Sequence, residues 1–259
     1  MNNYKKGVKN GWNAMSAWYQ SECVISVEQV HYSPFALGED AFKLLGNVSD
    51  KEILELGCGA AHNAIALALN GAHVIAVDFS EQQLKHARDL KARENISASL
   101  LQADIESLTF LRDKSFDIIL SVFALEFVPN ISLFMEECYR VLKPGGRLVV
   151  STTHPLSAFE WINPENALVV DDYFNPPVEL WQEDGQTGKE RGITFFRTME
   201  ELFKSMSTPG FRIDKLLEPI AVSREDIPKS PYRGPYWDTH WERFSLIPFA
   251  LLLRGVKPN

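Results

Sequence analysis

Short apolar runs alternate with amphipathic segments through the middle of the chain. Five runs have the length and composition of buried strands, at residues 51–56, 73–77, 98–102, 116–121 and 147–152. The intervening segments 60–70, 80–94 and 131–142 carry apolar residues at helical spacing, and Ser80 is a typical helix N-cap residue. Strands that are apolar throughout are typical of a parallel sheet with helices on both faces. The pattern therefore predicts an α/β fold with a doubly wound, mostly parallel sheet.

The N-terminal segment lacks this alternation. Residues 1–50 are rich in aromatic residues and are interpreted as irregular, apart from one helix. We expect that helix to begin between Pro34 and Glu39 and to end at Gly46, a typical residue after a helix C-terminus. Two interpretations of the aromatic residues stay open, a hydrophobic cover over a sheet edge and a lid over a ligand. We assign residues 1–46 to an N-terminal lid or cap.

The segment after the fifth strand also lacks a clear period. Residues 154–197 combine prolines, aromatic residues and acids, which is typical of a functional lid or a disordered insert. We expect a substrate lid here, inserted into one domain that spans 47–259. A helix over 198–207 and two strands, at 211–217 and from Phe249 onward, bring the predicted sheet to seven strands.

Composition narrows the classes of function. The net charge is −8, from 26 basic and 34 acidic residues, whereas proteins that bind nucleic acid usually carry a basic excess. The three cysteines are widely spaced and form no CxxC or Cys/His cluster, so neither a disulfide framework nor a metal site is predicted. The chain begins without an apolar signal segment and has no run long enough to span a membrane. We expect a cytoplasmic protein that acts on a small molecule, as a monomer or homodimer.

The turn after the first strand is the first candidate for ligand binding. It lies in the segment Glu55-Leu56-Gly57-Cys58-Gly59-Ala60-Ala61, whose two glycines allow backbone N–H groups to approach a ligand at a helix N-terminus. His62 occupies the position of the third glycine of the nicotinamide-dinucleotide fingerprint, which argues against a dehydrogenase. Glu55 would repel a pyrophosphate and favours a cationic ligand. Asp78 and Asp104 end the next two strands and together fit a nucleoside that lies across the sheet edge.

Four stretches resemble, in order and spacing, the motifs of class I S-adenosylmethionine-dependent methyltransferases, and most closely the small-molecule type 11 or type 25 domain. They are ELGCGAAHNAIALALNGAHVIAVDFSEQQLKHAR, QADIESL, DKSFDIILSVFALEFVPN and RVLKPGGRLVVSTTHP. The resemblance covers about residues 50–155 and implies a Rossmann-like fold with S-adenosyl-L-methionine as cofactor. One departure is Ala61, where many relatives have a third glycine.

The resemblance also implies roles for individual residues. Gly57, Cys58 and Gly59 would pack on the methionine portion, Asp78 would hold the ribose hydroxyls, and Asp104 and Ile105 would contact the adenine edge. The remaining cofactor candidates are Phe79, Ser80 and Gln83 near the adenine, Ser121, Val122 and Phe123 near the sulfonium, and Asn63 and Tyr32 near the amino-acid end.

Two residues are candidates for catalysis at the acceptor. His154 follows the fifth strand and has an ordinary pKa suited to proton abstraction, although it could instead only shape the pocket. Tyr173 lies beside two acids and is a candidate for binding or deprotonating the acceptor, with a solvated acidic turn as the alternative. Residues 175–178 (NPPV) resemble the NPPY signature of amide and adenine-amino methyltransferases. Because they lie in the insert and not after the fourth strand, we interpret them as a turn.

The predicted function is transfer of a methyl group to an O or N atom of a small aromatic or amphipathic metabolite. Aromatic residues in the N-terminal segment, the insert and the late loop 219–243 would form the acceptor pocket. Two alternatives stay open. The same cofactor pocket could support a cyclisation or another rearrangement, or the chain could be a non-catalytic cofactor-binding domain.

Overall fold

A computed structural model describes residues 3–163, 165–181 and 192–259. Its centre is a seven-stranded sheet with the order β11-β13-β6-β5-β2-β3-β4, in which only β13 runs antiparallel to its neighbours. The strands are β2 (Glu52–Leu56), β3 (His73–Asp78), β4 (Ser99–Gln102), β5 (Phe116–Val122), β6 (Leu142–Thr153), β11 (Arg212–Leu217) and β13 (Ala250–Val256). The predicted α/β class and the mostly parallel sheet are confirmed.

The order of the strands fixes where a ligand can bind. The chain builds outward from β2 through β3 to β4, then returns to place β5 and β6 on the other side of β2. In such sheets the loops diverge at the carboxyl ends of the two central strands and leave a crevice between them. Here that switch point lies between β2 and β5, where the glycine-containing turn begins.

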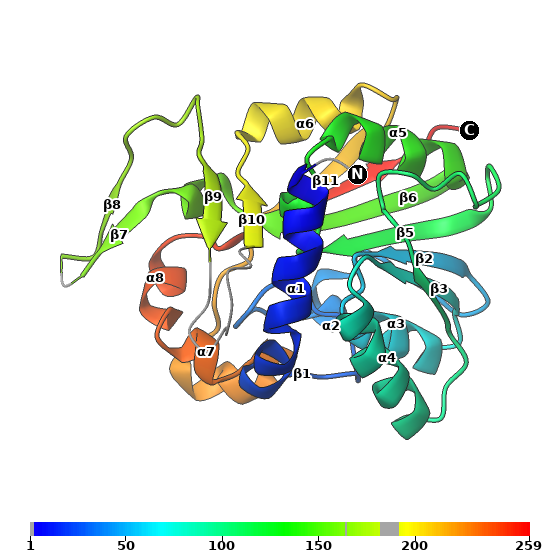
Figure 1. Cartoon of the computed structure of the whole chain (residues 1–259), viewed down its shortest axis with the longest axis horizontal. Helices are drawn as coiled ribbons and strands as arrows, with labels where there is room; N and C mark the ends of the chain where they lie inside the picture. The colour runs from blue at the N-terminus through cyan, green and yellow to red at the C-terminus, as the bar shows by residue number, and fades with distance from the viewer. Residues whose placement is uncertain (1–2, 164, 182–191) are drawn as a thin grey trace.

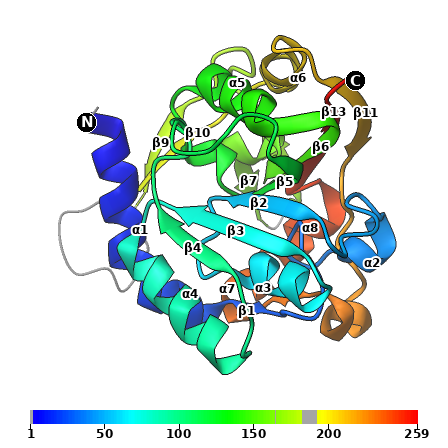
Figure 2. The same cartoon turned by 90° about the vertical axis from the view of Figure 1, so that its right-hand side faces the viewer.

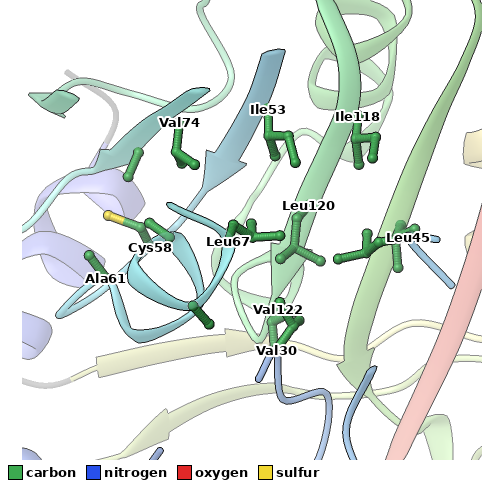
Figure 3. Packing of buried hydrophobic residues seen from close by; sticks show 14 of the residues in the cluster. Val30, Leu45, Ile53, Cys58, Ala61, Leu67, Val74, Ile118, Leu120 and Val122 are labelled. Carbon is green, nitrogen blue, oxygen red and sulfur yellow. The ribbon is translucent and has the colours of Figure 1, made fainter. Parts of the chain in front are cut away.

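Helices cover both faces of the sheet (Figures 1 and 2). One face carries α3 (His62–Leu69) and α4 (Glu81–Arg93), and the other carries α5 (Ile131–Val141) and α6 (Met199–Ser207). Figure 3 shows Leu67 of α3 among Ile53 and Leu120 of the sheet, all of them buried. Burying each such side chain contributes about 1.5–3 kcal/mol, so these two layers hold the switch point rigid.

The N-terminal segment differs from the expectation of an irregular stretch. It begins with α1 (Asn3–Glu22), a helix of 20 residues. Val8, Trp12, Met15 and Tyr19 recur at spacings of three and four, so they form one apolar stripe, and packing of that stripe outweighs the glycines in this helix. In Figure 1, α1 crosses in front of the carboxyl ends of the parallel strands.

The short helix predicted near Glu39 is only α2 (Glu39–Phe42), so the prediction that it ends at Gly46 was wrong. Lys43 adopts a left-handed conformation with φ of 50° and ends the helix earlier. The Glu39 carboxylate then accepts hydrogen bonds from the N–H groups of Leu44, Leu45 and Gly46. A side chain, and not a helix, therefore satisfies that stretch of backbone.

The described part of the predicted insert contains strands, although we found no period there. A 3-10 helix, η2 (Pro155–Ala158), precedes β7 (Glu160–Ile162), which pairs with β8 (Ala167–Val169). Next, β9 (Val178–Trp181) pairs with β10 (Gly192–Phe195). Residues 164 and 182–191 of the predicted lid lie outside the described residues. The rings of Tyr4 in α1 and Phe195 in β10 meet edge to face at 5.7 Å, so the two predicted lid segments touch each other.

The late loop adds a small aromatic subdomain beside the sheet. It contains η3 (Arg224–Lys229), β12 (Tyr232–Arg233), α7 (Pro235–Asp238) and α8 (Trp241–Leu246), and a further 3-10 helix, η1 (Leu125–Phe127), follows β5. β12 pairs with β1 (Val24–Ile25), which ties this loop to the end of α1. As predicted, the last strand begins only after Pro248, at Ala250.

Among the described helices, none combines the length and apolarity needed to cross a bilayer.

Candidate functional site

The turn from β2 into α3 forms the floor of a cavity at the switch point. Gly57 has a φ of 73°, and a Cβ added there would lie 2.2 Å from the Cβ of Ala124, so only glycine fits. The N–H groups of Gly57 and Cys58 both donate to the Val77 carbonyl, and the Gly59 N–H donates to Asp78 Oδ2 at 2.7 Å. The turn is therefore fixed to β3. We call the adjoining space, of about 150 Å³, the switch-point cavity; Gly57, Cys58, Gly59 and Asp78 lie in its lining.

Asp78 closes one side of this cavity. Its Oδ2 accepts from Gly59 and its Oδ1 accepts from the Ser80 N–H at 2.8 Å, so the carboxylate has a fixed orientation. Burial raises the pKa of Asp78, and these backbone hydrogen bonds oppose that rise. Phe79 and Gln83 also line the cavity. Each carboxylate oxygen has a second lone pair that a ligand hydroxyl can use.

Two buried polar atoms on the cavity wall have no partner in the described structure. They are Oε2 of Glu55 and Nδ1 of His31. Burial raises the pKa of Glu55 to about 8 and lowers the pKa of His31 to about 3. Asn63 also lines the cavity, and its side chain exchanges hydrogen bonds with the N–H and carbonyl of His31. An unpartnered buried polar atom costs about 1–3 kcal/mol, so a ligand that binds these atoms would remove that cost.

Helix α1 forms the outer wall of the switch-point cavity. Near its start, Lys5 Nζ lies 2.6 Å from Asp104 Oδ2 and also contacts Glu106. Near its end, Gln20 donates to Gln83 Oε1 at 3.2 Å. Asp104 and Ile105 both line the cavity, and Asp104 already binds Lys5 and the Glu106 N–H. Figures 1 and 2 show α1 beside α4, close to the ends of β3 and β4.

A second cavity, of about 310 Å³, adjoins the first, and we call it the aromatic cavity. The two cavities share five lining residues, which are Trp12, Tyr19, Phe123, Phe127 and Tyr232. The hydroxyls of Tyr19 and Tyr232 are hydrogen-bonded to each other, and burial raises both pKa values well above 10. These two tyrosines therefore stay protonated at neutral pH. A shared wall of this kind brings a ligand in each cavity close to the other.

Comparisons with known proteins find a match for the central part of the chain. The sequence model of a family described as a methyltransferase domain matches residues 54–150, from β2 to β6. Over these residues the chain resembles methyltransferase domains, and a solved structure with the same fold is reported below. The match includes the glycine turn, Asp78, Asp104 and the end of β5, which are the parts that surround the switch-point cavity.

Relatives extend this finding to different degrees. Demethylmenaquinone methyltransferase from Tropheryma whipplei is 42% identical over 117 residues, which are 44% of this chain and 47% of that protein. An uncharacterized protein from Haemophilus influenzae is 25% identical over 259 residues, 95% of this chain and 98% of its own. A solved S-adenosylmethionine-dependent methyltransferase from Mesorhizobium loti superposes with a TM-score of 0.66 at 24% identity, over 83% of this chain and 94% of that one. The chain thus spans about half of the named curated relative that it matches.

Three of the predicted cofactor residues do not line the switch-point cavity. Ser121 is fully buried and donates to the Leu56 carbonyl at 3.1 Å, which ties β5 to β2. Tyr32 is also fully buried and donates to Glu39 Oε2 at 2.6 Å, so its hydroxyl faces α2. Ser80 caps α4 by accepting from the Gln83 N–H. The other two residues near the end of β5, Val122 and Phe123, do line the cavity.

The two predicted catalytic residues, His154 and Tyr173, line neither of these cavities. His154 Nε2 lies 2.9 Å from Glu218 Oε1, and its Nδ1 accepts from the Leu156 N–H, so both ring nitrogens are engaged. Its backbone continues the pairing with β13, and burial lowers its pKa, which Glu218 partly offsets. The Tyr173 hydroxyl accepts from the Met199 N–H at 3.0 Å and serves the start of α6. The position of His154 directly after a strand indicated that it lies at the rim of the sheet. It did not indicate the direction in which its side chain points.

The structure instead draws attention to Glu126, which the sequence analysis did not single out. This glutamate lies in η1, is 2% exposed and lines the aromatic cavity. It accepts from Thr152 Oγ1 at 3.1 Å, and burial raises its pKa to about 7, while Arg197 acts in the opposite direction. An acid within the apolar run that follows β5 was the signal available in the sequence. Among the described residues, no group of His, Cys, Asp and Glu is arranged to hold a metal ion.

Proposed function

We propose that the protein transfers the methyl group of S-adenosyl-L-methionine to an O or N atom of a small aromatic or amphipathic acceptor. The observation that carries the proposal is the pair of adjoining cavities. One is lined by the glycine turn, Asp78 and Glu55, whose Oε2 has no partner among the described residues, and the other mainly by aromatic side chains. Methyl transfer needs two ligands that meet in a place from which water is excluded. The aromatic residues that line both cavities supply such a place.

The residues of the switch-point cavity fit a cofactor with a cationic amino acid at one end and a nucleoside at the other. Asp78 would accept from the ribose hydroxyls, and Asp104 and Ile105 would meet the adenine edge. Glu55 Oε2 would pair with the ammonium group, which would lower the raised pKa of this carboxyl. Gly57, Cys58 and Gly59 would pack on the methionine chain, while Val122 and Phe123 would face the sulfonium.

Bound S-adenosylmethionine would supply a methyl group that its sulfonium already activates. The protein then has to orient the acceptor, exclude water and, where the attacking atom carries a proton, take that proton. Glu126 suits the last task, because it lines the aromatic cavity, is buried and has a pKa near neutrality. It also neighbours Phe127, which lines both cavities. We infer that Glu126, and neither His154 nor Tyr173, is the proton acceptor.

Other features favour a small acceptor that two lid segments enclose. The net charge of −8 opposes binding of a polyanion, so we propose a metabolite as substrate and not nucleic acid. We further propose that residues 1–46 act as a cap on the domain 47–259, and residues 154–197 as its inserted lid. Contacts of α1 with β10 and with the switch-point cavity support this division.

Calorimetry with S-adenosylmethionine and S-adenosylhomocysteine, on protein purified free of ligand, tests cofactor binding. We expect both to bind at one site; the absence of any heat of binding for either would contradict the proposal. Incubation with metabolite pools and with cofactor labelled in the methyl or the aminobutyrate group then tests the reaction. Label that moves only from the methyl group supports methyl transfer, whereas an altered acceptor without label would favour the rearrangement alternative.

A further inference from the structure

An arginine lines the aromatic cavity and forms no ion pair within the described structure. Arg243 lies in α8, and one nitrogen of its guanidinium, Nη2, donates to the carbonyls of Leu156 and Phe159 at 3.4 and 3.3 Å. These are long hydrogen bonds to neutral acceptors. A partly buried cation without an anionic partner is unfavourable unless something else in the functioning protein balances its charge.

Among the residues that the structure describes, no acid balances the charge of Arg243. Burial lowers its pKa, and no carboxylate in this part of the chain raises it. Two acids, Glu126 and Glu179, line the same cavity, yet neither affects the pKa of Arg243. The positive charge of Arg243 instead lowers the pKa of His240, which burial already lowers, so the histidine beside it is neutral. Arg243 therefore carries the positive charge at the α8 end of the cavity.

The walls between this end and the cofactor side are aromatic. Phe123, Tyr232, Trp237, Phe244 and Phe249 all line the aromatic cavity, and the rings of Phe244 and Phe249 are stacked at 4.3 Å. Flat apolar walls of this kind favour a planar ring. A guanidinium at one end favours a carboxylate, whose two oxygens match its paired N–H groups.

We propose that the acceptor is a planar aromatic acid, with its ring between these side chains and its carboxylate on Arg243. That the bound acid is the methyl acceptor rests on the proposed function. The binding of the acid is measured independently of methyl transfer. The acid group would then lie at the α8 end, and the atom to be methylated would lie toward the wall that both cavities share.

Matched pairs of acid and amide test the inference. The probes are benzoate and benzamide, naphthoate and naphthamide, and indole carboxylate and indole carboxamide, each titrated with and without S-adenosylhomocysteine. Binding is followed by calorimetry and by quenching of tryptophan fluorescence. We expect at least one acid to bind about tenfold or more tightly than its amide, a difference of about 1.4 kcal/mol. If every amide, or the corresponding amine, binds as tightly as its acid, the proposal is wrong.

Variants assign the preference to one side chain. Arg243→Met should remove the preference for the acid, Arg243→Lys should keep part of it, and Arg212→Met, on the exposed face of β11, should leave it unchanged. Retention of the full preference in Arg243→Met would overturn the assignment. If Arg243→Met does not fold, the comparison of acid and amide affinities in Arg243→Lys and in the wild-type protein still tests the proposal. Acid binding that depends on Arg243 would support the binding preference even if these probes receive no methyl label, because the proposed function is tested separately by cofactor binding and by the labelled metabolite pools.

Discussion

Lys5 of α1 forms an ion pair of 2.6 Å with Asp104, which lies in the loop after β4. Lys5 also contacts Glu106, which is only 3% exposed. Burial lowers the pKa of Lys5, but the two carboxylates together raise it above its ordinary value. The pair joins α1, the outer wall of the switch-point cavity, to the loop after β4, which lines the same cavity, so it bears on how that cavity opens.

Loss of this contact should loosen α1. In Lys5→Met, the buried Glu106 carboxylate loses its cation, which costs on the order of 1–3 kcal/mol. We expect faster hydrogen exchange of the amides of α1, with little change in the sheet. Lys6→Met removes an exposed lysine from the same helix and serves as the control. Equal exchange of α1 in both variants would show that the ion pair does not hold the helix.

The proposed role of Asp78 predicts a specific loss of cofactor affinity. Asp78→Ala should raise the dissociation constant for S-adenosylhomocysteine about 10- to 100-fold, because a charged hydrogen bond to the ribose contributes roughly 1–3 kcal/mol. Asp89→Ala, at an exposed position of α4, should leave that constant unchanged in the same calorimetric titration. An unaltered constant for Asp78→Ala would remove this residue from the cofactor site.

Glu55 should make the stability of the ligand-free protein depend on pH. Its pKa is about 8 in the folded protein against an ordinary value of 4.5, so the folded state holds a proton that the unfolded state has lost. Stability should therefore fall as pH rises from about 4.5 through 8. Glu55→Gln should flatten that fall in urea unfolding at pH 6 and pH 9, and should also weaken cofactor binding. Glu52→Gln, exposed at the other end of β2, should behave as wild type.

Glu126 predicts the pH dependence of the reaction. A carboxylate that takes a proton must be ionised, so turnover should rise through a pKa of about 7. Glu126→Gln should lower kcat about 100-fold or more and lose that rise, with the affinity for S-adenosylhomocysteine nearly unchanged. His154→Asn should keep the wild-type profile. A profile that persists in Glu126→Gln, or disappears in His154→Asn, would restore His154 as the candidate.

The local sequence was sufficient for the central sheet and for much of the switch-point cavity. Gly57, Asp78 and Asp104 stand at strand ends, and the ends of adjacent parallel strands meet at one edge whatever the rest of the chain does. The same reasoning did not reveal the contacts of Tyr32 and His154, because their partners, Glu39 and Glu218, are set by tertiary packing. The position of a residue in a strand determines where its Cα atom lies, but the residues packed around it determine the orientation of its side chain.

The acceptor side depends still more on contacts between distant parts of the chain. The wall around Arg243 combines residues from α1, the end of β5 and the late loop, which no local pattern brings together. The period of Val8, Trp12 and Met15 was present in the sequence, but the density of aromatics in that segment drew attention away from it. A count of apolar spacing would have found α1.

The pairing of β1 with β12 gives the protein an order of assembly. Tyr19 meets Tyr232 across an interval of 213 residues, and Val24 pairs with Arg233. On a ribosome, the sheet strands from β2 to β6 can emerge and pair while the first helix still waits for its counterpart near the far end of the chain. Because β12 is followed only by α7, α8 and β13, the last strand of the central sheet, the room for the second reactant cannot be completed until nearly the whole chain has been made.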